Sequence, residues 1–247
     1  MGARNLLTGQ AEQARNVIPK AWDIPPRADG IYAPGGGAVR RWVRGEAFDI
    51  HLMIFGDSTA TGYGCQDAED VPGVRMARGL AEQSGQRVRL STKAIVGASS
   101  KGLAGQVDAM LVAGPPPDAA VIMIGANDVT VLNGIGPSAR RLGAAVQRLR
   151  SVGTTVIVGT CPDLGVVTAI PQPLRWTARS VGLRLARAQA AEVRTAGGVP
   201  VPLADLMAPH FQRQPDVMFS EDRFHPSSTG YALAAEQLLV SLRDALG

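Results

Sequence analysis

A serine, a histidine and an aspartate in this chain are spaced as a nucleophilic acyl-transfer site requires. Ser58 follows Gly56 and Asp57, and His225 comes three residues after Asp222 near the other end of the sequence. A serine hydroxyl is a weak nucleophile at neutral pH, so it needs an adjacent base, which His225 can supply. The imidazole needs a carboxylate on its other nitrogen, and a helical turn would bring Asp222 close enough to provide it.

Three further groups are candidates for stabilising the negative charge of a tetrahedral intermediate. Such an intermediate needs hydrogen-bond donors that are already aimed at its oxyanion. We expect the backbone N–H groups of Ser58 and Gly97 and the side-chain amide of Asn127 to converge there. Glycine at position 97 lets the backbone approach a substrate closely.

Each of these residues also has a purely structural interpretation. Ser58 and His225 can each cap a helix, and Gly97 can simply form a turn. Asn127 can cap the segment that follows it by bonding the local backbone. Loop-holding roles are the favoured interpretation for two neighbouring acids, Asp57 and Asp128.

The candidate residues follow segments with the patterns of β-strands. Strands are predicted at residues 51–55, 87–92, 119–124, 154–159 and 199–203. Helical spacing of apolar residues is found at 71–83, 103–112, 138–152, 176–195 and 229–246. Parallel strands need long crossovers, which helices supply. We therefore expect a three-layer α/β/α fold with a five-stranded parallel sheet and its site at the carboxyl ends of the strands.

The first part of the chain differs from the rest. Residues 1–48 are predicted to form an arm that wraps the body, and residues 49–247 a single domain. The arm is rich in glycine and proline and too short for a core of its own, although residues 5–20 are compatible with a short helix. It carries a basic group beside an aromatic ring: Arg40, Arg41, Arg44 and Trp42.

Composition excludes several classes of protein. Hydrophobic residues make up 45% and charged residues 19% of the 247 residues, which excludes a disordered chain. The net charge is +4, but the basic residues are scattered and aromatics are only 4%, so nucleic-acid binding is not expected. Two cysteines and three histidines without metal-ligand spacing predict no disulfide framework and no metal site. No apolar run is long enough for a membrane span, and the polar start predicts a cytoplasmic protein.

Four motifs together resemble the conserved blocks of the SGNH (GDSL-type) hydrolase family, in the family's order. They are Gly56-Asp57-Ser58, Gly97, Gly125-Ala126-Asn127-Asp128 and Asp222-Arg223-Phe224-His225-Pro226. Thr59 stands where the family often has leucine, and this difference does not affect the chemistry. The resemblance implies a flavodoxin-like fold and a Ser-His-Asp mechanism without a cofactor or metal. By matching position, the resemblance implies that Ser58 is the nucleophile and that Asp222 and His225 complete the triad. It also implies that the oxyanion hole consists of Ser58, Gly97 and Asn127.

The substrates are small molecules: an acyl donor, with a sugar or water as acceptor. In length and overall likeness the chain resembles cytoplasmic actinobacterial members of the family, which implies octanoyl transfer from acyl-CoA to a glucosylglycerate-type sugar. A carboxylesterase or thioesterase is the first alternative, and a non-catalytic carbohydrate-binding member is the second, disfavoured because all four blocks are intact. The proline-stiffened apolar loop 161–174 either holds an aliphatic acyl chain or packs on the sheet.

Overall fold

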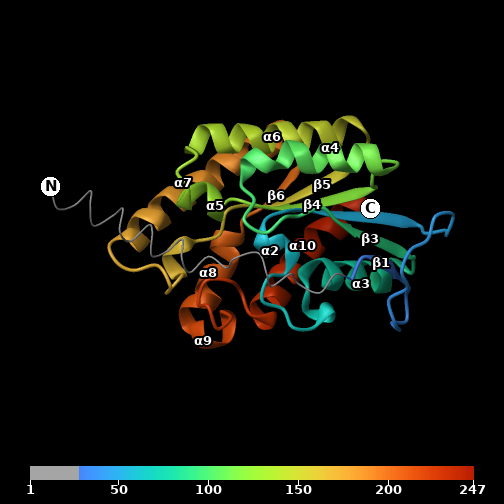
Figure 1. The fold of residues 1–247 in the computed structure, drawn as a ribbon, viewed down its shortest axis with the longest axis horizontal. Coiled ribbons are helices and arrows are strands. Elements are labelled where there is room, and N and C mark those ends of the chain that lie inside the picture. Colours follow the sequence, from blue (N-terminus) through green and yellow to red (C-terminus); the bar gives the residue numbers. More distant parts are fainter. Residues whose placement is uncertain (1–27) are drawn as a thin grey trace.

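The computed structural model describes residues 28–247 and folds them around one six-stranded sheet (Figure 1). Across the sheet the strand order is β1-β3-β2-β4-β5-β6. The strands from β2 to β6 are all parallel, and β1 alone pairs antiparallel, with β3. Their bounds are β1 (Gly30–Tyr32), β2 (Ile50–Gly56), β3 (Val88–Thr92), β4 (Ala119–Met123), β5 (Thr155–Gly159) and β6 (Val199–Val201).

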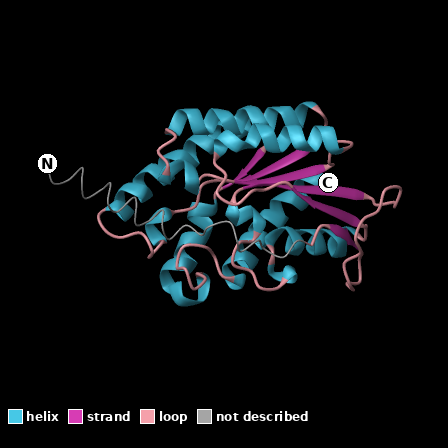
Figure 2. Cartoon of the chain, viewed as in Figure 1, coloured by secondary structure: helices cyan, strands magenta, loops and turns pink. Residues whose placement is uncertain are grey.

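Helices cover both faces of the sheet, so the predicted three-layer α/β/α class is confirmed (Figure 2). One layer is formed by α4 (Leu103–Ala113), α6 (Ile135–Ser151) and α7 (Leu174–Thr195), and the other by α3 (Pro72–Ser84), α8 (Leu203–Arg213) and α10 (Ser228–Leu246). Short helices complete the fold: α2 (Ser58–Thr61), α5 (Ala126–Thr130) and α9 (Pro215–Met218).

The hydrophobic core is divided by the sheet into two parts. Alternate residues of β2 point to opposite faces, as the strand geometry requires. Met53 and Phe55 pack with residues of α4 and α6, whereas Leu52 and Ile54 pack with residues of α3 and α10. β2 and β4 lie at the centre of the sheet, and every residue of both strands is buried. This position explains why their sequences are nearly continuous apolar runs.

The sheet has one more strand than the sequence predicted. β1 lies within the segment that we interpreted as an arm, and its three residues pair with β3 from Gly30↔Leu90 to Tyr32↔Val88. Three residues are too few for a period-two pattern to be recognised, although Ile31 and Tyr32 are both buried. The helix considered for residues 5–20 lies outside the described residues.

Two helical segments also differ from the predicted pattern. α6 begins at Ile135 rather than at residue 138, because Pro137 is compatible with a first helical turn. α8, which includes Pro209 and His210, was not among the predicted helices. A proline in a segment normally predicts that the segment is not helical, so the sequence did not indicate α8.

Candidate active site

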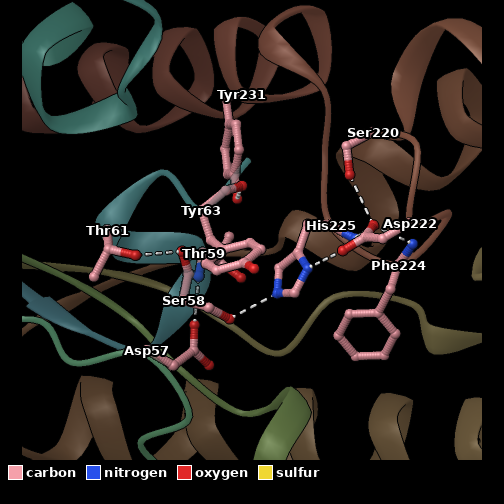
Figure 3. Close-up of polar contacts among 10 residues, drawn as sticks. All are labelled: Asp57, Ser58, Thr59, Thr61, Tyr63, Ser220, Asp222, Phe224, His225 and Tyr231. Carbon is pink, nitrogen blue, oxygen red and sulfur yellow. Dashed lines mark hydrogen bonds and ion pairs between the residues drawn. The ribbon is translucent and has the colours of Figure 1, made fainter. Parts of the chain in front are cut away.

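The three residues predicted to form a triad meet at the carboxyl edge of the sheet (Figure 3). Ser58 begins α2, directly after β2, and His225 lies in the loop before α10. His225 Nε2 is 2.9 Å from Ser58 Oγ, and His225 Nδ1 is 2.6 Å from Asp222 Oδ2. Both distances are within hydrogen-bonding range. The imidazole of His225 is buried and so has little alternative to these two partners.

The carboxylate of Asp222 is fixed by several donors at once. Its Oδ1 accepts hydrogen bonds from Ser220 Oγ at 2.7 Å and from the backbone amides of Phe224 and His225, both at 2.8 Å. Partial burial by itself raises the pKa of Asp222, but the hydrogen bonds from His225, Phe224 and Ser220 outweigh it and lower the pKa to about 2. Asp222 is therefore an anion at neutral pH and can hold the Nδ1–H of His225.

The backbone between the acid and the base has an unusual conformation. Arg223 has φ of +54°, a left-handed region that a non-glycine residue occupies at a cost of about 1 kcal/mol or more. This turn lets the amides of Phe224 and His225 point back at Asp222. The rings of Tyr63 and Phe224 pack against the imidazole, with centroids 4.7 and 5.0 Å from it. The turn and the two rings thus fix the orientation of His225.

The chain can place Ser58 here because residue 56 is glycine. Gly56 has φ of +133°, and a Cβ added there would lie 1.9 Å from the carbonyl oxygen of Met123 on β4. The buried carboxylate of Asp57 then accepts a hydrogen bond from the amide of Thr59 at 2.9 Å, which caps α2. Burial raises the pKa of Asp57 to about 6, although the hydrogen bond from Thr59 acts in the opposite direction. The predicted loop-holding role of Asp57 matches these contacts.

The predicted oxyanion donors lie on three segments that are tied together. The amides of Ser58 and Gly97 donate no hydrogen bond within residues 28–247, so both remain available. Asn127 donates through Nδ2 to the carbonyl of Ala98 at 2.8 Å, which links α5 to the loop of Gly97. An amide group carries two donor hydrogens, so the side chain of Asn127 retains one more.

The acid beside Asn127 has a structural environment, as predicted. Asp128 is buried and accepts hydrogen bonds from the amide of Ser100 at 2.9 Å and from its hydroxyl at 2.7 Å. It also accepts hydrogen bonds from Asn133 Nδ2 at 3.0 Å and Ser138 Oγ at 2.9 Å. With four donors around its carboxylate, Asp128 joins α5 to its neighbours.

Two buried glutamines, which the sequence analysis missed, hold the strand ends next to the site. Gln106 of α4 accepts a hydrogen bond from the amide of Gly56 and donates one to its carbonyl, each at 2.9 Å. Gln189 of α7 accepts a hydrogen bond from the amide of Cys161 at 2.7 Å and donates one to the carbonyl of Ile124 at 3.0 Å. A lone polar residue on the inward face of an otherwise apolar helix is the signal that indicates such a role.

An apolar cavity of about 80 Å³ adjoins the triad at His225. It reaches Thr59, which follows the predicted nucleophile, and Gly125, the first residue of the block that carries Asn127. The loop predicted to hold an acyl chain supplies part of its wall: Pro162, Leu164, Val166 and Val167. The described part of the predicted arm, residues 28–48, contributes nothing to this cavity. The basic group of the arm, Arg40, Arg41 and Arg44, is therefore not part of its wall.

Residues 28–247 contain no group of three or more histidine, cysteine, aspartate or glutamate side chains placed to hold a metal ion. Over the same range, none of the helices combines the length and the hydropathy of a membrane span.

Comparisons with known proteins agree with this geometry. The model of the GDSL-like Lipase/Acylhydrolase family matches residues 54–233. The GDSL-like esterase Rv1075c of Mycobacterium tuberculosis is 70% identical over 246 residues, which cover 100% of this chain and 78% of that relative. A lipase/acylhydrolase from Enterococcus faecalis has a similar fold, with a TM-score of 0.64, 20% identity and coverage of 79% of this chain and 96% of that one. The acetylxylan esterase Axe2 from Geobacillus stearothermophilus is also similar, with a TM-score of 0.58, 19% identity and coverage of 78% and 94%. The chain therefore belongs to the GDSL-like lipase/acylhydrolase family, as an SGNH-type esterase or acylhydrolase.

Proposed function

We propose that this protein hydrolyses carboxylic esters through an acyl-enzyme formed on Ser58. The observation that carries the proposal is the position of His225, which hydrogen-bonds Ser58 Oγ with one ring nitrogen and Asp222 with the other. A base held between a hydroxyl and an ionised carboxylate is the arrangement that activates a serine. In this proposal Ser58 is the nucleophile, His225 the general base and acid, and Asp222 the group that orients His225.

In the first half of the reaction, Ser58 Oγ bonds to the carbonyl carbon of the ester while its proton passes to His225 Nε2. The carbonyl π-bond breaks, and its electron pair becomes the oxyanion. When the carbonyl re-forms, the bond to the alcohol oxygen breaks and His225 gives its proton to that oxygen. The alcohol leaves and the acyl group remains bonded to Ser58. Asp222 stabilises the positive imidazolium between the two proton transfers.

In the second half, water takes the place of the alcohol. His225 removes a proton from water as the hydroxide oxygen bonds to the acyl carbon, and a second oxyanion forms. Collapse of this intermediate breaks the bond to Ser58 Oγ, which regains its proton from His225, and releases the carboxylic acid.

The proposed oxyanion hole consists of the Ser58 amide, the Gly97 amide and the side chain of Asn127. Neither backbone amide donates a hydrogen bond to another of residues 28–247, which supports this assignment, because donors without a competing partner are available as the negative charge develops. The hydrogen bond from Asn127 to Ala98 sets the loop that carries Gly97. A positively charged group is not needed, since preorganised N–H dipoles in a buried site suffice.

The apolar cavity beside His225 is the proposed site for the acyl chain. At about 80 Å³ this cavity is smaller than the apolar cavity of roughly 150 Å³ that binds benzene, which favours short to medium acyl chains.

Transfer of an octanoyl group from acyl-CoA to a glucosylglycerate-type sugar is the second candidate. The apolar wall contributed by Leu164, Val166 and Val167 supports an aliphatic acyl group in either reaction. An acyltransferase must also present an acceptor hydroxyl at high effective concentration to compete with water. Hydrolysis is the first candidate because it needs no acceptor site and because the 70% identical relative from Mycobacterium tuberculosis is a GDSL-like esterase.

The experiment compares acyl chain length and acceptor in one assay. The p-nitrophenyl esters of two- to sixteen-carbon acids are expected to give a maximum of kcat/KM at eight carbons or fewer, and Ser58→Ala should remove turnover throughout. Octanoyl-CoA is then supplied with and without a glucosylglycerate acceptor, and products are identified by mass spectrometry. Free octanoate in both cases supports hydrolysis. A sugar ester that replaces most of the free acid would establish the transferase instead.

A further inference from the structure

A second pocket, of about 500 Å³, lies beside β3 and is separate from the catalytic edge. It is bounded by β3, the beginning of β2, the end of α4 and residues 41–48. No residue lines both this pocket and the cavity beside His225. His51, in its wall, precedes Ser58 by seven residues along β2, and at about 3.3 Å per residue this separates the two by roughly 20 Å.

Arg89 is the central cation of this pocket. It pairs with His51 in the register of β2 and β3, so both side chains lie on the same face of the sheet. Its guanidinium carbon lies 3.6 Å from the ring centre of Trp42 and 5.3 Å from that of Phe48. Trp42 is itself held by a hydrogen bond from its Nε1 to the carbonyl of Glu46 at 3.1 Å. The two rings therefore fix the plane of the guanidinium, as cation–π stacking does.

Among the described residues, none accepts a hydrogen bond from the guanidinium of Arg89. Within residues 28–247 it forms neither an ion pair nor a side-chain hydrogen bond, although it is half-buried. Burial lowers the pKa of Arg89, yet a guanidinium stays protonated in proteins. A stacked, partly desolvated fork with five unused donors is suited to an oxyanion that accepts two hydrogen bonds in parallel.

Three more cations line the pocket without a counter-ion. Arg41, Arg44 and Lys93 form no ion pair among the described residues, whereas neighbouring Arg40 is paired with Glu46 at 2.9 Å. Asp29 is the one carboxylate in the lining, and its Oδ2 already accepts a hydrogen bond from the amide of Thr92 at 3.1 Å. Four cations face one anion, so the pocket favours a ligand with more than one negative charge.

The lining also includes an unsatisfied buried group and apolar surface. His51 shares a hydrogen bond between Nε2 and Ser91 Oγ at 3.0 Å, but its Nδ1 is buried without a partner. Buried polar atoms are seldom left unpaired unless a site serves a ligand or water. Apolar side chains complete the wall: Trp42, Phe48, Met53 and Met110.

We propose that this pocket binds a small molecule that carries a pyrophosphate group next to a flat apolar group, the chemistry of a nucleoside diphosphate. The fork of Arg89 matches a phosphate in geometry, and Arg41, Arg44 and Lys93 balance the remaining negative charge. The size of the pocket is within the range of small-ligand sites. The inference is independent of the proposed hydrolysis, because it uses no residue of the triad.

Calorimetric titration of the full chain at low salt tests the proposal. ADP is expected to bind with one-to-one stoichiometry, inorganic pyrophosphate to displace it, and adenosine not to bind. Arg89→Gln should weaken ADP binding at least tenfold, and Arg89→Lys should weaken it less, because lysine keeps the charge but lacks the fork. Lys93→Gln provides a second variant of the same pocket, and melting curves verify that each variant is folded.

Arg243→Gln is the matched control, since it makes the same change of charge on α10, where Arg243 is paired with Asp244. This control should change the dissociation constant of ADP by less than twofold. Turnover of a p-nitrophenyl ester should be unchanged in Arg89→Gln. The proposal is wrong if ADP does not bind at millimolar concentration, if adenosine binds as tightly as ADP or pyrophosphate fails to compete. It is also wrong if Arg243→Gln weakens binding as much as Arg89→Gln, which would indicate diffuse attraction by net charge.

Discussion

Replacing Gln106 by leucine should destabilise the protein and slow its reaction together. The amide of Gly56 would lose its only hydrogen-bond partner among the described residues, whereas its carbonyl would keep the bond from the amide of Ile95 at 3.0 Å. An orphaned buried N–H costs about 1–3 kcal/mol, and an ordinary lost hydrogen bond costs about 0.5–1.5 kcal/mol. We therefore expect the free energy of unfolding to fall by about 2–4 kcal/mol.

The same change should lower kcat, because Gly56 directly precedes Asp57 and Ser58 and its carbonyl anchors the loop of Gly97 through Ile95. Urea-induced unfolding measures the loss of stability. An unchanged slope of the unfolding free energy against urea concentration would show that the variant exposes the same surface area on unfolding. Gln147→Leu makes the same chemical change at an exposed position of α6 and should alter stability by less than about 0.5 kcal/mol. Equal effects of the two substitutions, or a stable Gln106→Leu with normal kcat, would refute the reasoning.

Three further predictions concern the oxyanion hole, Asp57 and the acyl cavity. Asn127→Ala should lower kcat by about 10²–10³ with little change in KM, because its donor acts on charge that develops in the transition state; a mainly KM effect in steady-state kinetics would contradict this. The pKa of Asp57 is raised to about 6 in the folded chain, whereas it is about 4 in the unfolded chain. Between these two pH values the folded chain binds a proton that the unfolded chain does not. Stability from this group therefore rises as the pH falls from 7 to 4, and melting curves should show that Asp57→Asn removes the rise, whereas parallel pH profiles would argue against it. Val166→Phe fills part of the cavity and should shift the preferred ester to a shorter acyl chain; an unchanged chain-length profile would mean that the acyl group lies elsewhere.

Much of the fold was predictable because its patterns are local. The continuous apolar runs of β2 and β4 and the helical spacing between them indicate a parallel sheet covered on both faces. The triad was predictable too, since Ser58 lies in a short motif after β2 and Asp222 and His225 lie together in a second short motif before α10. Asp222 and His225 are three residues apart, and the hydrogen bonds within their loop explain this short spacing.

The remaining features depend on contacts between distant parts of the chain. Gln106 reaches Gly56 across 50 residues and Gln189 reaches Ile124 across 65 residues, so neither role can be inferred from neighbouring sequence. β1 exists because Ile31 and Tyr32 are buried against the body, not because three residues favour a strand. The stacking of Arg89 on Trp42 likewise joins the arm to β3, whereas the sequence alone suggested only a scattered basic surface.

Covalent labelling tests the central claim most directly. A reactive phosphonate ester bonds irreversibly to an activated serine, which displaces its leaving group, and the phosphonyl adduct mimics the tetrahedral intermediate. The intact protein and its peptides can then be examined by mass spectrometry. We predict one phosphonyl group per chain, located on Ser58, with loss of esterase activity in proportion to labelling. No label should form in Ser58→Ala. Labelling should be much slower in His225→Ala, because the Ser58 hydroxyl then lacks the base that lies 2.9 Å from it in the unmodified protein. A label on another residue, or esterase activity retained in a folded Ser58→Ala protein, would contradict the account.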